Sequence, residues 1–516
     1  MNPRSGCTSL LVGLAVVFLA MPLVAEPAHV TVVTKEGRFG GTLSVDRVEV
    51  KTNSGVVKVP VSELTSVQFG DTDVIRTRTG RRIKGVVRVE DWTLQESGAN
   101  RPLARADLRF IVPQVALGTP RRGQIVDAAA ANGMTYHVRV PEKYNPSSGG
   151  PAIVLFHGSN AYSADYLKGI TQRWPKIASD YVLIGIDGEW PTQKDPDGPP
   201  AFVYTYVDFV GKSKYKGFPG TDRESPALVA EALAEIKQQL KLTKVFVTGH
   251  SQGGFLVYSC LMNYPELFAG GMPISAGLIF QCEPTAYEDP AIREQQRKLA
   301  IAIVHGDRDP LVAVGMARAA HESFLRDGFP MLRLLVAKGA GHAFISLPFE
   351  DGIRWLESMT SDDPRALLGF AQRAFAGREY RDALAYLGRA QELDKAGTQA
   401  AAGKALRQRI EQLAGAPAKS LEAAIQRNDG SGWVSDFDEF RRQFEFTDAA
   451  GGVMAAFAKL RQEHQAPAEK LWSDARRAFG EGDKDKGYRL CDQIVKTYYA
   501  SDYYRYARQA LDERPR

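Results

Sequence analysis

The feature that most constrains this chain is a Gly-x-Ser-x-Gly turn between an apolar stretch and a helix-like stretch. The motif is Gly249-His250-Ser251-Gln252-Gly253, preceded by Val245-Phe246-Val247 and followed by Phe255-Leu256-Val257. Glycines on either side of Ser251 remove Cβ atoms where a strand and a helix would otherwise collide, and they tolerate the backbone angles of a sharp turn. The pattern therefore predicts a strand, a tight turn and a helix, with the Ser251 hydroxyl standing clear of the backbone.

The length and charge of the chain set its scale. With 516 residues and 44% hydrophobic content, it has the composition of a globular protein and room for about three domains. The formal net charge of +5 is small for this length, and no long basic run or zinc-ligand spacing occurs, so nucleic acid is not an expected partner. No motif in the sequence implies a metal or an organic cofactor, and we expect none.

Residues 1–25 have the pattern of a secretory signal peptide. Arg4 precedes a nearly continuous apolar run from Leu10 to Ala25, and the first acidic residue is Glu26. We expect cleavage at the end of this run and export to the periplasm or the extracellular space, without stable insertion of the mature protein into a membrane. An uncleaved anchor is the less favoured alternative, because the run is short for a spanning helix and Pro22 interrupts it.

The four cysteines are compatible with more than one state. Cys7 lies in the predicted signal peptide, and Cys491 is far away in the sequence from the others. Cys260 and Cys282 could form a disulfide in an oxidising compartment. Their positions, in the helix after Ser251 and after a predicted strand, favour two buried thiols instead.

Residues 26–115 predict a small β-rich domain with an internal repeat. The layout of Val30 to Leu43 recurs at Val74 to Gly85, and the stretch Val61 to Val67 is echoed by Ala104 to Ile111. Two strand-rich units with polar turns indicate paired β-meanders or small barrels, and they resemble SH3-like or Sm-like modules by pattern only. The domain either binds a partner, separates other domains or packs as an appendage.

After a linker expected at residues 115–133, residues 134–360 predict an α/β domain. Apolar strands alternate with helical stretches, which indicates a doubly wound, mostly parallel sheet with helices on both faces. Ligands of such sheets bind beyond the carboxyl ends of the strands. The expected strands include Ala152–Phe156, Val182–Ile186, Val245–Val247, Leu299–Val304 and Leu332–Val336.

A nucleophilic serine needs a base, and the chain has eight histidines. His342 closes a glycine-containing loop directly after the last predicted strand, which suits a base that must reach Ser251. His321 falls inside a predicted helix, and His464 lies in a separate helical region. We therefore predict His342 as the general base.

The remaining parts of a catalytic site follow two other strands. Asp307 and Asp309 come directly after the strand that ends at Val304, and either could orient the base. An oxyanion needs two backbone N–H donors. One is expected from Gln252, and the other from Ser159 or Asn160, of which we choose Ser159.

Four motifs together resemble the α/β-hydrolase fold serine esterases over residues 136–355. Within that fold the chain looks most like the phospholipase/carboxylesterase family, which includes acyl-protein thioesterases, and the exported polyhydroxybutyrate depolymerase and feruloyl esterase-like group. The resemblance implies a Ser251–His342–Asp309 triad, with Asp309 preferred to Asp307 because the acid of this family lies three residues before a valine. The motifs are Leu155-Phe156-His157-Gly158, Gly249-His250-Ser251-Gln252-Gly253-Gly254, His305-Gly306-Asp307-Arg308-Asp309 and Gly341-His342.

The stretch from Asp187 to Asp222 is rich in proline and aromatic residues. It follows the carboxyl end of a predicted strand, so it could overhang the site as a lid or as the wall of an acyl or aryl pocket. A surface loop with its own small core is the alternative.

Residues 362–516 predict a helical domain that begins after the break at Ser361-Asp362-Asp363-Pro364. The spacing resembles a tetratricopeptide unit, and much of it recurs about three repeat lengths later. Such a domain usually presents a surface for a protein partner, although a helical cap that only stabilises its neighbour fits the pattern too. The positions are Leu367, Ala371, Ala374, Gly377, Tyr380, Ala383, Leu387 and Ala390, and then Ala475, Ala478, Gly482, Gly487, Cys491 and Ile494.

The sequence as a whole predicts an exported serine hydrolase that cleaves a small-molecule or polymer-borne carboxylic ester through an acyl-enzyme. A serine peptidase or amidase of the same fold would use the same residues. A scaffold whose hydrolase domain is vestigial is the third alternative, and the intact set of motifs argues against it.

Overall fold

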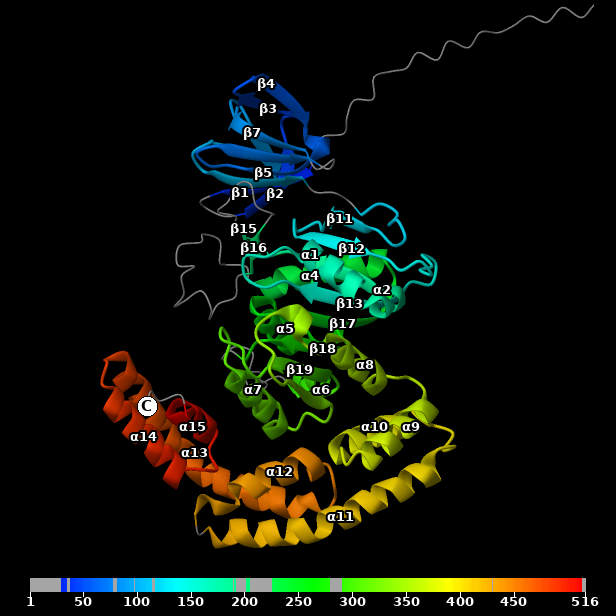
Figure 1. Cartoon of the computed structure of the whole chain (residues 1–516), viewed down its shortest axis with the longest axis vertical. Helices are drawn as coiled ribbons and strands as arrows, with labels where there is room; N and C mark the ends of the chain where they lie inside the picture. Colours follow the sequence, from blue (N-terminus) through cyan, green and yellow to red (C-terminus); the bar gives the residue numbers. More distant parts are fainter. Residues whose placement is uncertain are drawn as a thin grey trace, which may run out of the picture. The chain divides into compact units, whose positions relative to one another are not determined.

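The computed structural model describes residues 29–34, 38–77, 81–96, 98–113, 117–188, 190–191, 201–204, 225–278, 290–428 and 430–512 (Figure 1). The predicted signal peptide, Cys7, Cys282 and most of the Asp187–Asp222 stretch lie outside the described residues. The chain forms two compact units, a β-rich unit that ends at Pro113 and a larger unit that runs from Gln114 onward and also includes Val33–Arg38. Each unit is described by itself below.

The β-rich unit is built on one ten-stranded sheet with the order β4-β3-β7-β6-β5-β10-β1-β2-β8-β9. This order is symmetric about its centre. If β1 is exchanged with β6, β2 with β7, and so on through β5 with β10, the same order is obtained, read from the opposite edge of the sheet. Two five-strand units with the same layout would give this order. The internal repeat and the likeness to SH3-like or Sm-like modules both stay predictions. The strands are β1 (His29–Thr34), β2 (Arg38–Leu43), β3 (Arg47–Thr52), β4 (Gly55–Pro60), β5 (Leu64–Gln68), β6 (Asp73–Thr77), β7 (Arg82–Val87), β8 (Thr93–Glu96), β9 (Ala99–Pro102) and β10 (Leu108–Pro113).

Alternating side chains of these strands form the core of the β-rich unit. Val48 and Val50 of β3 and Leu94 of β8 are fully buried in it. One carboxylate is buried as well, because both oxygens of Asp73 accept hydrogen bonds from the Arg105 guanidinium, at 2.6 and 2.9 Å. This pair satisfies a charge that burial alone would make unfavourable.

The larger unit contains an eight-stranded sheet with the order β11-β12-β14-β13-β17-β18-β19-β20. The pairs from β14 through β20 are parallel, which confirms the predicted mostly parallel sheet, and β11 and β12 add an antiparallel edge. A separate two-stranded sheet is formed by β15 (Trp190–Pro191) and β16 (Phe202–Val203). The strands of the main sheet are β11 (Ile125–Ala129), β12 (Thr135–Arg139), β13 (Gly150–Phe156), β14 (Val182–Ile186), β17 (Leu242–His250), β18 (Gly270–Ile274), β19 (Ala300–Gly306) and β20 (Leu332–Ala337).

The position of β11 corrects the predicted boundary of this domain. Residues 115–133 were expected to be a linker before a domain that starts at residue 134. Instead, Ile125 to Ala129 pair in antiparallel register with Thr135 to Arg139, so the sheet begins inside the expected linker. A two-stranded antiparallel pair can form across a short turn, which here is Ala130 to Met134.

Helices cover both faces of the sheet, as expected for a doubly wound fold. Side chains of α4 (Ser225–Gln239), α5 (Gln252–Asn263) and α7 (Val314–Arg326) pack on one face. Those of α1 (Ser163–Arg173), α2 (Pro175–Asp180) and α8 (Phe349–Met359) pack on the other. The short helix α6 (Pro290–Arg297) precedes β19, and Cys260 is buried in α5.

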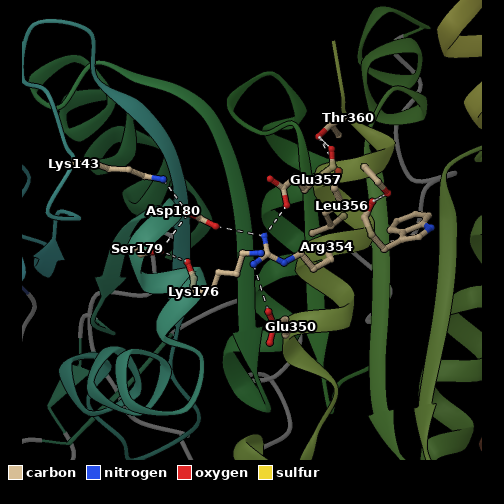
Figure 2. Close-up of polar contacts among 11 residues, drawn as sticks. Lys143, Lys176, Ser179, Asp180, Glu350, Arg354, Leu356, Glu357 and Thr360 are labelled. Carbon is tan, nitrogen blue, oxygen red and sulfur yellow. Dashed lines mark hydrogen bonds and ion pairs between the residues drawn. The ribbon is translucent and has the colours of Figure 1, made fainter. Parts of the chain in front are cut away.

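Ion pairs connect α2 with α8 on their shared face, and Figure 2 shows Arg354 of α8 pointing toward Asp180 at the end of α2. The Arg354 Nη1 atom lies 3.6 Å from Asp180 Oδ2 and 3.0 Å from Glu357 Oε2, and Nη2 lies 3.4 Å from Glu350 Oε1. Lys143 Nζ lies 3.0 Å from the other oxygen of Asp180. Because these side chains are partly exposed, each pair contributes about 0–1 kcal/mol.

The rest of the larger unit is helical. The first helices share a core with α8, and Trp355 Nε1 donates to Asp382 Oδ2 at 2.9 Å across that contact. Most positions of the predicted repeat pattern are buried in helix pairs, although a tetratricopeptide identity stays a prediction. None of the helices in the described part of the chain is both long and apolar enough to cross a bilayer. The helices are α9 (Pro364–Ala376), α10 (Tyr380–Leu393), α11 (Ala400–Arg427), α12 (Val434–Phe444), α13 (Ala450–Gly480), α14 (Lys484–Thr497) and α15 (Tyr503–Asp512).

Candidate active site

Ser251 lies at the turn between β17 and α5, with φ 54° and ψ −118°. A non-glycine residue in this region costs about 1–3 kcal/mol and persists only where its surroundings hold it. Here the Ser251 N–H donates to the carbonyl oxygen of Ile274 at 2.9 Å. The flanking glycines allow close packing, because a Cβ on Gly253 would lie 2.4 Å from the carbonyl oxygen of Phe156, and one on Gly249 would lie 2.3 Å from that of Gly253. The predicted strand, turn and helix are therefore present.

Asp309 and His342 are joined by a hydrogen bond of 2.6 Å between Asp309 Oδ2 and His342 Nδ1. The Asp309 side chain has no exposed surface, and its Oδ1 accepts from the N–H groups of Leu311 and Val312, both at 2.9 Å. Burial opposes ionisation, but the hydrogen bonds from Val312, His342 and Leu311 outweigh it and hold the pKa of Asp309 below its ordinary value. The loop after β19 thus presents a carboxylate to His342.

The other candidates, Asp307 and His321, and the neighbouring His305 have contacts of their own. Asp307 accepts a hydrogen bond from the Gly339 N–H at 2.6 Å, which closes the loop after β20. His305 donates from Nε2 to the carbonyl oxygen of Val312 at 2.9 Å, so it shapes the turn that carries Asp309. His321 lies in α7 beside Glu322.

The end of β17 contacts the loop that carries His342. His250, which directly precedes Ser251, donates from Nε2 to the His342 carbonyl oxygen at 2.6 Å, and the two ring centroids are 4.7 Å apart. His342 therefore lies beside the turn that carries Ser251, and its role as the general base stays a prediction.

The loop after β13 also lies against Ser251. A Cβ placed on Gly158 would be 3.5 Å from the Ser251 Cβ. The His157 N–H donates to the hydroxyl of Tyr204 at 3.0 Å, and the Gly158 N–H donates to the hydroxyl of Tyr166 at 3.2 Å. Ser159 comes next in this loop. Gln252 is the first residue of α5, and the first backbone N–H groups of a helix have no acceptor within that helix.

Tyr204 and His157 form a buried contact that the sequence did not predict. Their rings stack with centroids 4.6 Å apart, and the Tyr204 hydroxyl donates to the Ile186 carbonyl oxygen. The Gln252 side-chain amide bonds both the N–H and the carbonyl of Tyr204, at 3.2 and 2.9 Å. Burial lowers the pKa of His157, and its Nε2 accepts from the Gly188 N–H at 3.0 Å, so the ring is neutral with its proton on Nδ1. The contact between Tyr204 and His157 holds the loop after β13 in place.

The stretch expected to be a lid is described in part. Phe202, Val203 and Tyr204 are buried, and the Phe202 N–H donates to the Ala161 carbonyl oxygen at 3.0 Å. Residues 189, 192–200 and 205–222 lie outside the described residues, so the lid or pocket wall stays a prediction.

A second buried network holds the start of α1, the helix after this loop. Asp187 accepts from the N–H and the hydroxyl of Ser163, at 3.0 and 2.6 Å, and from His137 Nε2 at 2.9 Å. His137 Nδ1 contacts Asp127 at 2.7 Å. Burial alone would lower the pKa of His137, but the charges of Asp187 and Asp127 and their hydrogen bonds raise it to about 9. The ring is thus a buried cation between two carboxylates.

Among the described residues, no group of three or more His, Cys, Asp or Glu side chains is arranged to hold a metal ion. At one edge of the sheet, the strained turn of Ser251 lies beside a loop whose histidine is hydrogen-bonded to a buried carboxylate. Together with the loop after β13, this arrangement can support nucleophilic attack with proton transfer.

Comparison with known proteins agrees with this chemistry. Residues 151–356 match the family model described as Phospholipase/Carboxylesterase, which covers less than half of the chain. This match supports an α/β-hydrolase-like central domain of the esterase type. No functionally curated protein matches the chain.

Several solved structures share similarity with parts of this chain. A thermostable esterase has 16% identity and a TM-score of 0.31, with coverage of 64% of this chain and 89% of that chain. Acyl-protein thioesterase 2 of Zea mays has 13% identity and a TM-score of 0.33, covering 44% and 99%. An acetyl xylan esterase from Aspergillus awamori has 13% identity and a TM-score of 0.34, covering 45% and 99%.

Proposed function

We propose that the protein is an exported serine hydrolase that cleaves carboxylic esters through an acyl-enzyme. Ser251 is the nucleophile, His342 the general base and then acid, and Asp309 the residue that orients His342. The backbone N–H groups of Gln252 and Ser159 stabilise the oxyanion.

The observation that carries the proposal is the 2.6 Å hydrogen bond between Asp309 and His342, next to the strained turn of Ser251. Because an ionised Asp309 accepts the proton of Nδ1, His342 keeps its lone pair on Nε2. That nitrogen is the one that a triad uses to take the proton of the serine hydroxyl.

The reaction follows from these roles. Ser251 Oγ attacks the ester carbonyl carbon while its proton moves to His342 Nε2, and the carbonyl oxygen becomes an oxyanion. The bond to the alcohol oxygen then breaks, and His342 returns the proton to the leaving alcohol. A water molecule repeats both steps on the acyl-enzyme, which releases the acid and regenerates Ser251.

The choice of Ser159 as an oxyanion donor rests on its neighbours. The N–H groups of His157 and Gly158 already donate to the hydroxyls of Tyr204 and Tyr166. Ser159 is the next residue along the loop, and its N–H is the next available to face the acyl group.

Labelling of the mature protein with a fluorophosphonate probe tests the proposal. Wild type should be labelled and should hydrolyse p-nitrophenyl acetate, and Ser251→Ala should lose both while its melting temperature stays close to that of wild type. A folded wild type that is not labelled would overturn the proposal and favour a scaffold. Faster turnover of a matched peptide anilide than of the aryl ester would favour an amidase.

Export and the roles of the flanking regions are part of the same proposal. The pattern of residues 1–25 supports export. We infer that the helical region after α8 binds a protein partner through its helix pairs, as helical repeats usually do. Secretion of the full-length chain, and loss of secretion after deletion of residues 1–25, would test the first point.

A further inference from the structure

We propose that Tyr166 and His250 form a positioning pair that holds two loops in place against Ser251. One is the loop after β13 that contains Gly158 and Ser159, called the oxyanion loop below, and the other is the loop after β20 that carries His342. The inference rests on the proposed function, since it assigns Tyr166 and His250 to the same reaction. Neither residue touches the reacting atoms in the mechanism above, so both act through their neighbours.

The pair forms a continuous chain of hydrogen bonds between two loops that are far apart in the sequence. The Tyr166 hydroxyl lies 3.2 Å from the Gly158 N and 2.8 Å from His250 Nδ1. His250 Nε2 lies 2.6 Å from the His342 carbonyl oxygen. One end of the chain is thus in the oxyanion loop, and the other is the backbone of the proposed base.

The chemistry of the groups fixes the direction of each hydrogen bond. The His342 carbonyl can only accept, so His250 Nε2 carries a proton. A neutral imidazole then has a bare Nδ1, to which the Tyr166 hydroxyl donates, and the Tyr166 oxygen accepts from the Gly158 N–H. Each donor in the chain meets one acceptor.

These hydrogen bonds require a neutral His250 ring and a protonated Tyr166 hydroxyl, and burial favours both states. Burial lowers the pKa of His250 to about 4, so its ring is neutral at neutral pH. Burial raises the pKa of Tyr166 to about 12, so its hydroxyl keeps the proton that it donates. The His250 side chain faces Asp309, His305 and His342, and the effects of these groups are smaller than that of burial.

Packing limits the motion of both side chains. The rings of Tyr166 and His250 lie 5.2 and 5.9 Å from the ring of Phe344, which follows His342 by two residues. A Cβ on Gly158 would lie 3.1 Å from the Tyr166 hydroxyl oxygen, 3.4 Å from His250 Nδ1 and 3.5 Å from the Ser251 Cβ. The positioning pair, the nucleophile and the oxyanion loop therefore converge on one point.

The function that follows is alignment of the transition state. A loop displaced by about 1 Å can lower turnover by roughly 100-fold without changing the residues that react. If the pair only stabilised the fold, its loss would lower the melting temperature and leave kcat of the folded fraction unchanged. If it positions the loops, kcat of the folded protein falls while KM stays close to that of wild type, whether or not the melting temperature also falls.

The test compares Tyr166→Phe with Tyr144→Phe in the full-length mature protein. Tyr144 is a matched control because its hydroxyl also donates a buried hydrogen bond, in its case to the backbone carbonyl of Leu240 at 2.9 Å. We expect Tyr166→Phe to lower kcat for p-nitrophenyl acetate roughly 10- to 100-fold, with KM within about 3-fold. The Tyr144→Phe variant should keep the wild-type kcat.

Two replacements of His250 separate its hydrogen bond to Tyr166 from its hydrogen bond to the His342 carbonyl. A glutamine places an amide nitrogen near the former Nε2 and can still donate to the His342 carbonyl, whereas an asparagine places its amide near the former Nδ1 and can contact only Tyr166. We expect His250→Gln to retain more turnover than His250→Asn. In the double variant of Tyr166→Phe with His250→Gln, the losses should be less than additive, since the two residues share one hydrogen bond.

The outcomes distinguish failure of the positioning role from failure of the proposed serine hydrolase function. Wild-type kcat in Tyr166→Phe, or a melting temperature that falls with unchanged kcat, would overturn the positioning role while the fluorophosphonate labelling of wild type still supports the serine hydrolase. A folded wild type without labelling would overturn the proposed function and the positioning role with it. Additive losses in the double variant would show that Tyr166 and His250 act separately.

Discussion

Replacement of Asp309 by asparagine should remove almost all turnover and leave the fold intact. Asp309 Oδ1 accepts two backbone N–H groups, from Leu311 and Val312. The carbonyl oxygen of an asparagine must take that place, because its NH₂ group there would face two donors. The NH₂ group is then directed at His342 Nδ1, which lies 2.6 Å from Oδ2 in the wild type.

The consequence is the wrong tautomer of the base. To accept from the amide, His342 Nδ1 must give up its proton, so the proton moves to Nε2 and the ring can no longer take one from Ser251. The same exchange in serine proteases lowers kcat about 10⁴-fold. This corresponds to about 5 kcal/mol on the activation barrier. The melting temperature should change little, because every group around the new amide still has a partner.

The assay is kcat/KM for p-nitrophenyl acetate, with the melting temperature measured in parallel. Asp307→Asn is the matched control, because Asp307 lies in the same loop and accepts the Gly339 N–H, which an asparagine can also do. Activity of Asp309→Asn above about a tenth of wild type would refute the tautomer argument, since it predicts a loss far larger than 10-fold. A larger loss in Asp307→Asn than in Asp309→Asn would show that the acid is Asp307.

Three further changes test the packing and the charges of the described residues. Gly253→Ala should lower both the melting temperature and the labelling rate, at a cost of about 1–3 kcal/mol, because its Cβ would lie 2.4 Å from the Phe156 carbonyl oxygen. The raised pKa of His137, about 9, predicts stability that is complete below pH 6.5 and is lost as the pH rises through 9. Urea unfolding at pH 6 and pH 9.5 should show a loss of roughly 3 kcal/mol that His137→Gln lacks; equal stability at both values would contradict the charged state. Trp355→Phe should destabilise by about 1–3 kcal/mol with unchanged kcat, because the Asp382 carboxylate loses its 2.9 Å donor; an unchanged melting temperature would show that this bond is not needed.

The sheet could be predicted from the sequence where its strands are buried on both faces. The strands that hold Ile153, Val247 and Ile303 are short uninterrupted apolar runs, which is how central parallel strands look in any sequence. The edge strand β11 could not, because its residues Ile125 to Ala129 include an aspartate and adjoin a segment rich in Gly, Pro and Arg. An edge strand needs no continuous apolar run, so its pairing with β12 decides its structure.

The candidate site could be predicted where a serine hydrolase would need a particular residue type at a fixed position in the sequence. Ser251 is marked by its glycines, and the pairing of His342 with Asp309 follows from their positions after neighbouring strands. Tyr166 and Tyr204 carry no such signal, because each meets the oxyanion loop through a hydroxyl whose partner lies elsewhere in the sequence. A polar residue at the end of an apolar strand, as His250 is, was the one available hint.

The arrangement around Asp309 explains how one carboxylate can serve one histidine when three lie nearby. His250 and His305 each donate from Nε2 to a backbone carbonyl oxygen, and burial lowers the pKa of both rings. His305 Nε2 also lies 3.5 Å from Asp309 Oδ2, but its proton is donated to the Val312 carbonyl oxygen, and His342 makes the shorter contact with Asp309, at 2.6 Å. In the proposed mechanism, a proton taken from Ser251 would therefore stay on His342 until the leaving group accepts it, because burial disfavours the charged forms of His250 and His305.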